Sequence, residues 1–152
     1  MGVTRAIRVG TAGALDAGLA LGELVVAEQA ICADGTSRAL GARERVAGDP
    51  ALVAALADCR PQAPRGAVVS SDLFYELGER RFAAWRAAGA LAVEMEAAAL
   101  FAVGRRRGVA VGCALAITDL LAGGRRERID AGGLIAAGLA VGRLGAAAFG
   151  AA

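Results

Sequence analysis

The sequence predicts an α/β fold built around a largely buried sheet, and three observations lead to that prediction. Short apolar segments alternate with segments of helical composition along the chain. Residues 109–117 form a continuous apolar run, as expected of a central strand that is buried on both faces. With 152 residues, 57% of them hydrophobic, the chain can bury one sizeable core. We therefore expect a single domain over residues 1–152.

The first predicted elements are strands. Residues 6–10 form a short apolar strand, which the sequence Gly-Thr-Ala-Gly closes. Residues 24–31 form a second strand, followed by a turn at Asp34 and Gly35. The segment from 41 to 65 is polar and broken.

A short helix is expected within that polar segment, over residues 50–57. Asp49 is a suitable cap for it, and Pro50 suits the first helical position. Residues 67–69 then form a strand, and residues 82–88 are predicted to be helical.

The next elements are a strand over residues 91–93 and an Ala-rich helix over residues 97–107. The helix ends in three consecutive arginines, whose charges suit the negative end of the helix dipole. Gly108 follows as a natural stop. The C-terminal residues 132–152 are mostly Ala and Gly with larger apolar residues at helical spacing, which favours a buried terminal helix.

The composition excludes several classes of protein. The net charge is only +2, with arginines and acids interspersed, so nothing points to nucleic acid as a partner. Absence of histidine excludes histidine-based catalysis and histidine metal sites, and we expect neither metal nor cofactor. Arg143 interrupts the one apolar stretch long enough for a membrane span, which argues against a membrane protein. The three cysteines form no CxxC pattern, which is typical of reduced thiols in a cytoplasmic protein.

Polar residues and glycines follow four of the predicted strands. They are Gly10-Thr11-Ala12-Gly13, Ser70-Ser71-Asp72, Glu94-Met95-Glu96 and Thr118-Asp119. In open α/β sheets, ligands bind just beyond the carboxyl ends of the strands, so the four segments predict one polar pocket. Two carboxylates beside a core are costly unless something binds them, and a ligand rich in hydroxyl groups would satisfy both Glu94 and Glu96.

Five segments together resemble the nucleoside phosphorylase-I family, which comprises the hexameric bacterial purine nucleoside phosphorylases, the uridine phosphorylases and related nucleosidases. They are residues 7–15, 34–38, 70–75, 92–98 and 117–119. The resemblance implies a three-layer phosphorylase-like fold, with a central mixed sheet flanked by helices. It also implies a homo-oligomer, with dimers arranged into a hexamer. Family members begin well upstream of the segment around Arg8, so we expect this chain to be the N-terminally truncated, C-terminal portion of the family domain.

The resemblance also implies roles for individual residues. The phosphate-binding residues would be Arg8, Gly10 and Thr11, with the Thr11 hydroxyl bridging phosphate and ribose. The ribose-binding residues would be Met95, Glu96 and Glu94. The base would stack on Phe74 near Tyr75, against Val93.

The implied catalytic pair is Asp119, which protonates a purine leaving group, and Arg128, its activating partner. Arg125 or Arg126 could take the place of Arg128. An aspartate is normally ionised at neutral pH, so this role requires burial or an arginine contact that changes during catalysis.

The implied reaction is phosphate-dependent cleavage of the N-glycosidic bond of a purine ribo- or deoxyribonucleoside, with inorganic phosphate as co-substrate. The nucleophile is already an anion, so no histidine base is required. Asp119 favours a purine, and a uridine phosphorylase is the alternative; residues 76–80 supply an arginine but not the glutamine with which those enzymes read uracil. A nucleosidase would leave Arg8 without an anion to hold. A non-catalytic fragment and a regulatory nucleoside-binding module are the alternatives from other classes.

Overall fold

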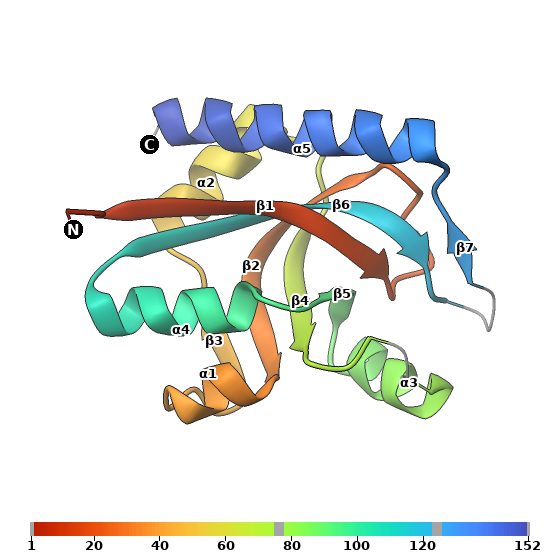
Figure 1. The fold of residues 1–152 in the computed structure, drawn as a ribbon, viewed down its shortest axis with the longest axis horizontal. Helices are drawn as coiled ribbons and strands as arrows, with labels where there is room; N and C mark the ends of the chain where they lie inside the picture. Colours follow the sequence, from red (N-terminus) through yellow and green to blue (C-terminus); the bar gives the residue numbers. More distant parts are fainter. Residues whose placement is uncertain (1, 75–77, 123–125, 152) are drawn as a thin grey trace.

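The computed structural model describes residues 2–74, 78–122 and 126–151 (Figure 1). The strands are β1 (Arg5–Ala14), β2 (Leu24–Ala33), β3 (Arg45–Ala47), β4 (Arg65–Ser71), β5 (Ala90–Glu94), β6 (Ala110–Leu120) and β7 (Glu127–Arg128). The helices are α1 (Gly35–Ala39), α2 (Pro50–Cys59), α3 (Glu79–Ala87), α4 (Ala97–Arg107) and α5 (Ala131–Ala151).

The strands form one mixed sheet in the order β3-β2-β4-β5-β1-β6-β7. An additional antiparallel pairing joins β2 to β6, so that β2, β4, β5, β1 and β6 pair in a closed ring. Helices α2 and α5 lie on one side of the strands, and α1, α3 and α4 lie on the other (Figure 1). The predicted α/β fold, with a central mixed sheet between layers of helices, is confirmed.

The central strand is β6. All its residues from Val111 to Asp119 are buried, as the continuous apolar run predicts. Its parallel partner is β1, in a register that runs from Arg5 opposite Ala110 to Ala14 opposite Leu120.

Two predicted helices are confirmed together with their end signals. The Asp49 carboxylate accepts hydrogen bonds from the N–H groups of Ala51 and Leu52, at 3.0 and 3.1 Å, and Pro50 occupies the first position of α2. Helix α4 has the predicted bounds, and Gly108 ends it in the left-handed conformation with φ 66°.

The prediction that a strand ends at Gly10 is wrong. Strand β1 continues through residues 10–13 to Ala14, because its pairing with β6 continues that far. A register shift between Ala12 and Gly13 is the only irregularity of this pairing. Similarly, Thr118 and Asp119 belong to β6 rather than follow it, since Asp119 pairs with Arg128 of β7.

Other differences are smaller. Asp34 and Gly35 open the short helix α1 instead of a simple turn, because the Asp34 carboxylate accepts the N–H of Ser37 at 2.8 Å. The polar segment from 41 to 65 contains β3, which a buried Val46 and pairing with β2 hold in place. Helix α3 begins three residues earlier than expected, at Glu79.

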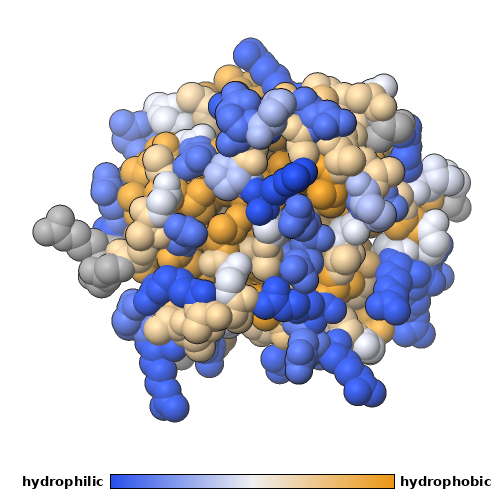
Figure 2. Space-filling model, turned by 180° about the vertical axis from the view of Figure 1, so that it is seen from behind, coloured by the Kyte–Doolittle hydropathy of each residue, from blue (hydrophilic) through white to orange (hydrophobic). Residues whose placement is uncertain are grey.

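Helix α5 is buried on one face only, so the prediction of a buried terminal helix holds for half of it. Ala137, Val141, Leu144 and Ala148 are buried, whereas Leu134, Ile135, Leu139 and Phe149 are exposed. Hydrophobic residues also lie exposed among hydrophilic ones on the face that Figure 2 shows. Within the part of the chain that the structure describes, α5 is the one helix long and apolar enough to cross a membrane, by length and composition alone.

Close packing of α4 against β6 generates a testable prediction. A Cβ atom on Gly104 would lie 2.5 Å from Val111 Cγ2 and 2.7 Å from the Val109 carbonyl oxygen. We expect Gly104→Ala to lower the free energy of unfolding by about 1–3 kcal/mol. Urea unfolding measures this change.

Gly138→Ala in α5 is the matched control. No atom lies within 4 Å of its added Cβ, so the higher helix propensity of Ala should raise the stability by about 0.5–1 kcal/mol. Equal effects of the two substitutions would contradict the close approach of α4 and β6.

Candidate active site

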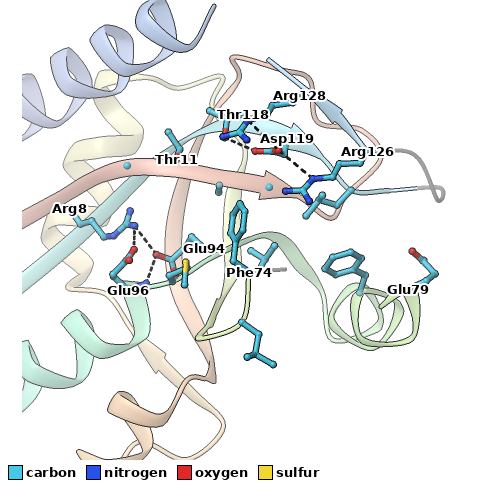
Figure 3. Close-up of a pocket in the computed structure, with 18 residues that line it drawn as sticks. Arg8, Thr11, Phe74, Glu79, Glu94, Glu96, Thr118, Asp119, Arg126 and Arg128 are labelled. Carbon is cyan, nitrogen blue, oxygen red and sulfur yellow. Dashed lines mark hydrogen bonds and ion pairs between the residues drawn. The ribbon is translucent and has the colours of Figure 1, made fainter. Parts of the chain in front are cut away.

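A pocket of about 650 Å³ opens where β1, β5 and β6 meet. Every predicted site residue that the structure describes lines this pocket: Arg8, Gly10, Thr11, Phe74, Val93, Glu94, Met95, Glu96, Asp119 and Arg128. Tyr75 lies outside the described residues. Arg8 with Glu94 and Glu96 lies on one side of the pocket, Asp119 with Arg126 and Arg128 lies on the other, and Phe74 lies between them (Figure 3).

Arg8 is the cation of the first side. Its Nη2 lies 3.3 Å from Glu94 Oε2 and also forms a hydrogen-bonded ion pair with Glu96 Oε2. Burial lowers the pKa of Arg8, but the hydrogen bond to Glu96 and the charge of Glu94 outweigh it, so that the pKa is raised overall. The guanidinium therefore stays charged throughout the pH range in which proteins are stable.

Gly10 and Cys113 shape the surroundings of Arg8. A Cβ atom on Gly10 would collide with the Arg8 guanidinium, so the absence of a side chain here allows the guanidinium to lie along β1. Cys113 is buried and pairs with Arg8 across β1 and β6. Burial raises the pKa of the Cys113 thiol to about 12, although the charge of Arg8 acts in the opposite direction.

Glu94 is bonded within the protein. Its side chain is fully buried and accepts hydrogen bonds from the Ser70 hydroxyl and from the N–H groups of Glu96 and Ala97, both at 2.9 Å. Ser70 Oγ in turn accepts the N–H of Ala98 at 2.7 Å. These bonds cap the N-terminus of α4 and, with the Arg8 ion pair, offset the cost of burying the charge. Glu96, with a 55% exposed side chain, is the acid of this pair that faces the open pocket.

Asp119 is the buried acid of the second side. Its Oδ2 accepts a hydrogen bond from the Thr118 hydroxyl at 3.1 Å. Its Oδ1 lies 3.7 Å from Arg126 Nε and 3.8 Å from Arg128 Nε, and it is buried without a hydrogen-bond partner among the described residues. This oxygen can therefore accept a hydrogen bond from a ligand in the pocket.

Arg126 joins Asp119 to the predicted aromatic platform. Its guanidinium carbon lies 5.4 Å from the centre of the Phe74 ring, within the range of a cation–π interaction. The sequence suggested Arg126 only as a substitute for Arg128, whereas the structure brings both arginines to Asp119. Arg125 lies outside the described residues.

Sequence reasoning missed the contribution of α3. Glu79 and Phe82 both line the pocket. Helical periodicity could have placed them on one face, because they are three residues apart, but nothing in the sequence indicates which face turns to the pocket. Among the described residues, no group of three or more Cys, Asp or Glu side chains is arranged to hold a metal ion.

Comparison with known proteins decides the family. Residues 1–142 match the family described as the Phosphorylase superfamily. The chain belongs to the phosphorylase superfamily. This membership confirms the resemblance that the five sequence segments indicate and agrees with the mixed sheet between helices.

Individual relatives are similar over most of this phosphorylase-superfamily chain. It is 35% identical over 135 residues to a guanosine phosphorylase from Halorubrum lacusprofundi, an alignment that covers 86% of this chain and 56% of the relative. It is 31% identical over 136 residues to a DeoD-type purine nucleoside phosphorylase from Shewanella denitrificans, with 85% and 57% covered. The chain thus spans a little over half the length of the curated relatives that it matches.

The raised pKa of Cys113 gives a second prediction. Roughly one molecule in ten thousand carries this thiolate at pH 8, so iodoacetamide should label the exposed Cys59 and spare Cys113. Folding raises this pKa from 9.0, so Cys113 stabilises the fold below pH 9, and the contribution is lost as the pH rises towards 12.

Mass spectrometry of tryptic peptides measures the labelling. Unfolding in urea is the positive control, because it exposes Cys113 to the reagent. Labelling of Cys113 in the folded chain at a rate similar to that of Cys59 would contradict the burial beneath Arg8.

Proposed function

We propose that this site catalyses phosphorolysis of a purine nucleoside, in which inorganic phosphate releases the base and forms ribose 1-phosphate. The main observation behind this proposal is that the two sides of the pocket differ in charge. The permanently charged guanidinium of Arg8 lies on one side. Asp119 Oδ1, a buried carboxylate oxygen without a hydrogen-bond partner among the described residues, lies on the other. The names of the relatives, guanosine phosphorylase and purine nucleoside phosphorylase, support the same reaction.

Phosphate would bind at Arg8, beside Gly10 and Thr11. Charge-assisted hydrogen bonds from a guanidinium are the strong way to hold a phosphate oxyanion, and the Thr11 hydroxyl can bridge phosphate and sugar. One phosphate oxygen would attack the anomeric carbon as the bond from that carbon to the base nitrogen breaks. The sugar carries positive character at that moment, so an anion held beside it stabilises the transition state.

The sugar and the base would occupy the space between the two sides. Glu96 would accept hydrogen bonds from the sugar hydroxyls, beside Met95, and so fix the anomeric carbon near phosphate. We assign Glu94 the role of positioning Arg8 and the start of α4. Its oxygens already accept hydrogen bonds from three donors within the protein, namely the Ser70 hydroxyl and the N–H groups of Glu96 and Ala97. Phe74, which is 43% exposed, offers a face on which the base can stack against Val93.

Asp119 would complete the reaction at the base. The electron pair of the broken glycosidic bond moves into the purine, and Asp119 would deliver a proton to purine N7, so that a neutral base leaves. A pyrimidine has no N7 to receive this proton, which favours purine over uridine. Arg126 or Arg128 would then stabilise the carboxylate that remains.

Assembly follows the resemblance in this proposal. The exposed apolar residues of α5, among them Ile135 at 67% exposure, support association into a dimer-based hexamer. A cytoplasmic location likewise stays a prediction.

Base release from inosine, guanosine and uridine, each with and without phosphate, tests the proposed function. We expect the 152-residue chain to release hypoxanthine and guanine only when phosphate is present. Chromatography of the free bases measures the release. Release from uridine alone would favour a uridine phosphorylase, release without phosphate would favour a nucleosidase, and no release would favour a non-catalytic fragment or a binding module.

Asp119→Asn is the control for the chemical step in the same assay. It should lower kcat for inosine by about 10²–10⁴-fold, because the amide cannot deliver the proton. Phosphate affinity should be kept, since Arg8 lies on the other side of the pocket.

Single and double substitutions of Arg126 and Arg128 identify the partner of Asp119. We expect Arg128→Ala to lower kcat with little change in phosphate affinity, because its Nε lies beside the Asp119 carboxylate. Arg126→Ala should also raise KM for the nucleoside, since Arg126 contacts Phe74. Steady-state kinetics measures both parameters, and unchanged turnover in Arg128→Ala would remove its assigned role.

A further inference from the structure

We propose that the Glu96 carboxylate exchanges between Arg8 and the sugar hydroxyls, so that phosphate and nucleoside bind cooperatively. This inference rests on the proposed function and deepens it. It concerns how the anion subsite and the sugar subsite are joined by one side chain.

The Arg8 guanidinium contacts two carboxylates. Arg8 Nη2 lies against both Glu94 Oε2 and Glu96 Oε2, and the Arg8 side chain is only 15% exposed. A phosphate that approaches Arg8 therefore meets two negative charges beside the cation that would bind it. One of them must withdraw before the anion can make close contact.

The two carboxylates differ in their freedom to withdraw. Glu94 is fully buried, and leaving Arg8 would also break its bonds to Ser70 and to the start of α4. Glu96 is 55% exposed, and Arg8 is the partner that the structure gives its carboxylate. Glu96 is therefore the acid that can move at low cost.

Release of Glu96 requires no movement of the backbone. Its N–H is held by Glu94 Oε2 at 2.9 Å, so the residue stays in place while its side chain changes rotamer. Glu96 lines the pocket, so sugar hydroxyls bound there can donate to the freed carboxylate. Phosphate thus prepares the sugar site, and by thermodynamic linkage a bound sugar prepares the phosphate site by the same factor.

Phosphate binding in the absence of nucleoside is the first test. Isothermal titration calorimetry with inorganic phosphate should show about two- to fivefold tighter binding to Glu96→Gln than to the unmodified chain, the range expected for removal of one partly exposed ion pair. Glu96→Ala should give the same direction. Loss of a binding residue would ordinarily weaken binding, so tighter binding supports the exchange, provided that removal of another acid from the pocket does not have the same effect.

Glu79→Gln is the matched control. Glu79 lines the same pocket, and its side chain is 54% exposed, but it pairs with Arg86 on α3 rather than with Arg8. Figure 3 places it on the far side of the pocket from Glu96. This variant therefore removes one negative charge from the pocket without freeing Arg8, and its phosphate affinity should stay within about 1.5-fold of the unmodified chain.

Cooperativity is tested with 9-deazainosine, whose base is attached through carbon and cannot be released. Saturating phosphate should tighten its binding to the unmodified chain, and the effect should shrink towards none in Glu96→Gln. Fluorescence or calorimetric titration measures both.

The outcomes separate this inference from the proposed function. Failure of the unmodified chain to bind phosphate would overturn the proposed function and the exchange together. Three results would overturn the exchange alone. The first is phosphate binding to Glu96→Gln and Glu96→Ala that is equal to or weaker than binding to the unmodified chain. The others are equally tightened phosphate binding in Glu79→Gln, and binding of 9-deazainosine that does not change with phosphate.

Discussion

The pocket depends on the buried carboxylate of Glu94. This one group contacts Ser70 of β4, the start of α4 and Arg8 of β1, while it belongs to β5 itself. A buried charge without partners would cost several kcal/mol. Arrangements of the four elements that keep these contacts with Glu94 are therefore favoured over arrangements that lose them. The position of the Arg8 guanidinium and the turn that presents Glu96 both follow from that requirement.

Parallel pairing of β1 with β6 sets the other dimension of the site. It places Arg8 beside Cys113 and, after the register shift, Gly13 beside Asp119. Arg8 and Asp119, from the two sides of the pocket, thus lie on two neighbouring strands that are hydrogen-bonded along their whole length. Their separation is therefore a property of the rigid sheet, whereas Phe74, Arg126 and α3 approach the pocket from its rim.

Local signals explain why part of this fold could be predicted. Asp49 with Pro50, and the three arginines before Gly108, fix the ends of their helices through bonds and charges that lie within the segment itself. The end of β1 is different, because it is set by pairing with β6, a hundred residues away in sequence. The formation of β3 and the choice of which face of α5 is buried depend on tertiary contacts in the same way. These contacts cannot be predicted from the local sequence.

The candidate site shows the same division. Every predicted residue that the structure describes lines one pocket, whereas the residues that α3 adds to it were missed. The different environments of Glu94 and Glu96 could not be predicted, because the sequence of residues 94–96 does not show which carboxylate contacts Ser70 and the start of α4. The sequence suggested that a ligand would satisfy both acids, yet the protein itself satisfies Glu94.

The charges of the pocket bear on the proposed binding of phosphate. Among the described lining residues, three arginines (Arg8, Arg126 and Arg128) face four carboxylates (Glu79, Glu94, Glu96 and Asp119). Arg86 of α3 pairs with Glu79 and balances its charge, so the repulsion that an entering phosphate dianion would meet comes mainly from the two acids beside Arg8. In the proposed function, moving the Glu96 carboxylate away from Arg8 would relieve that repulsion.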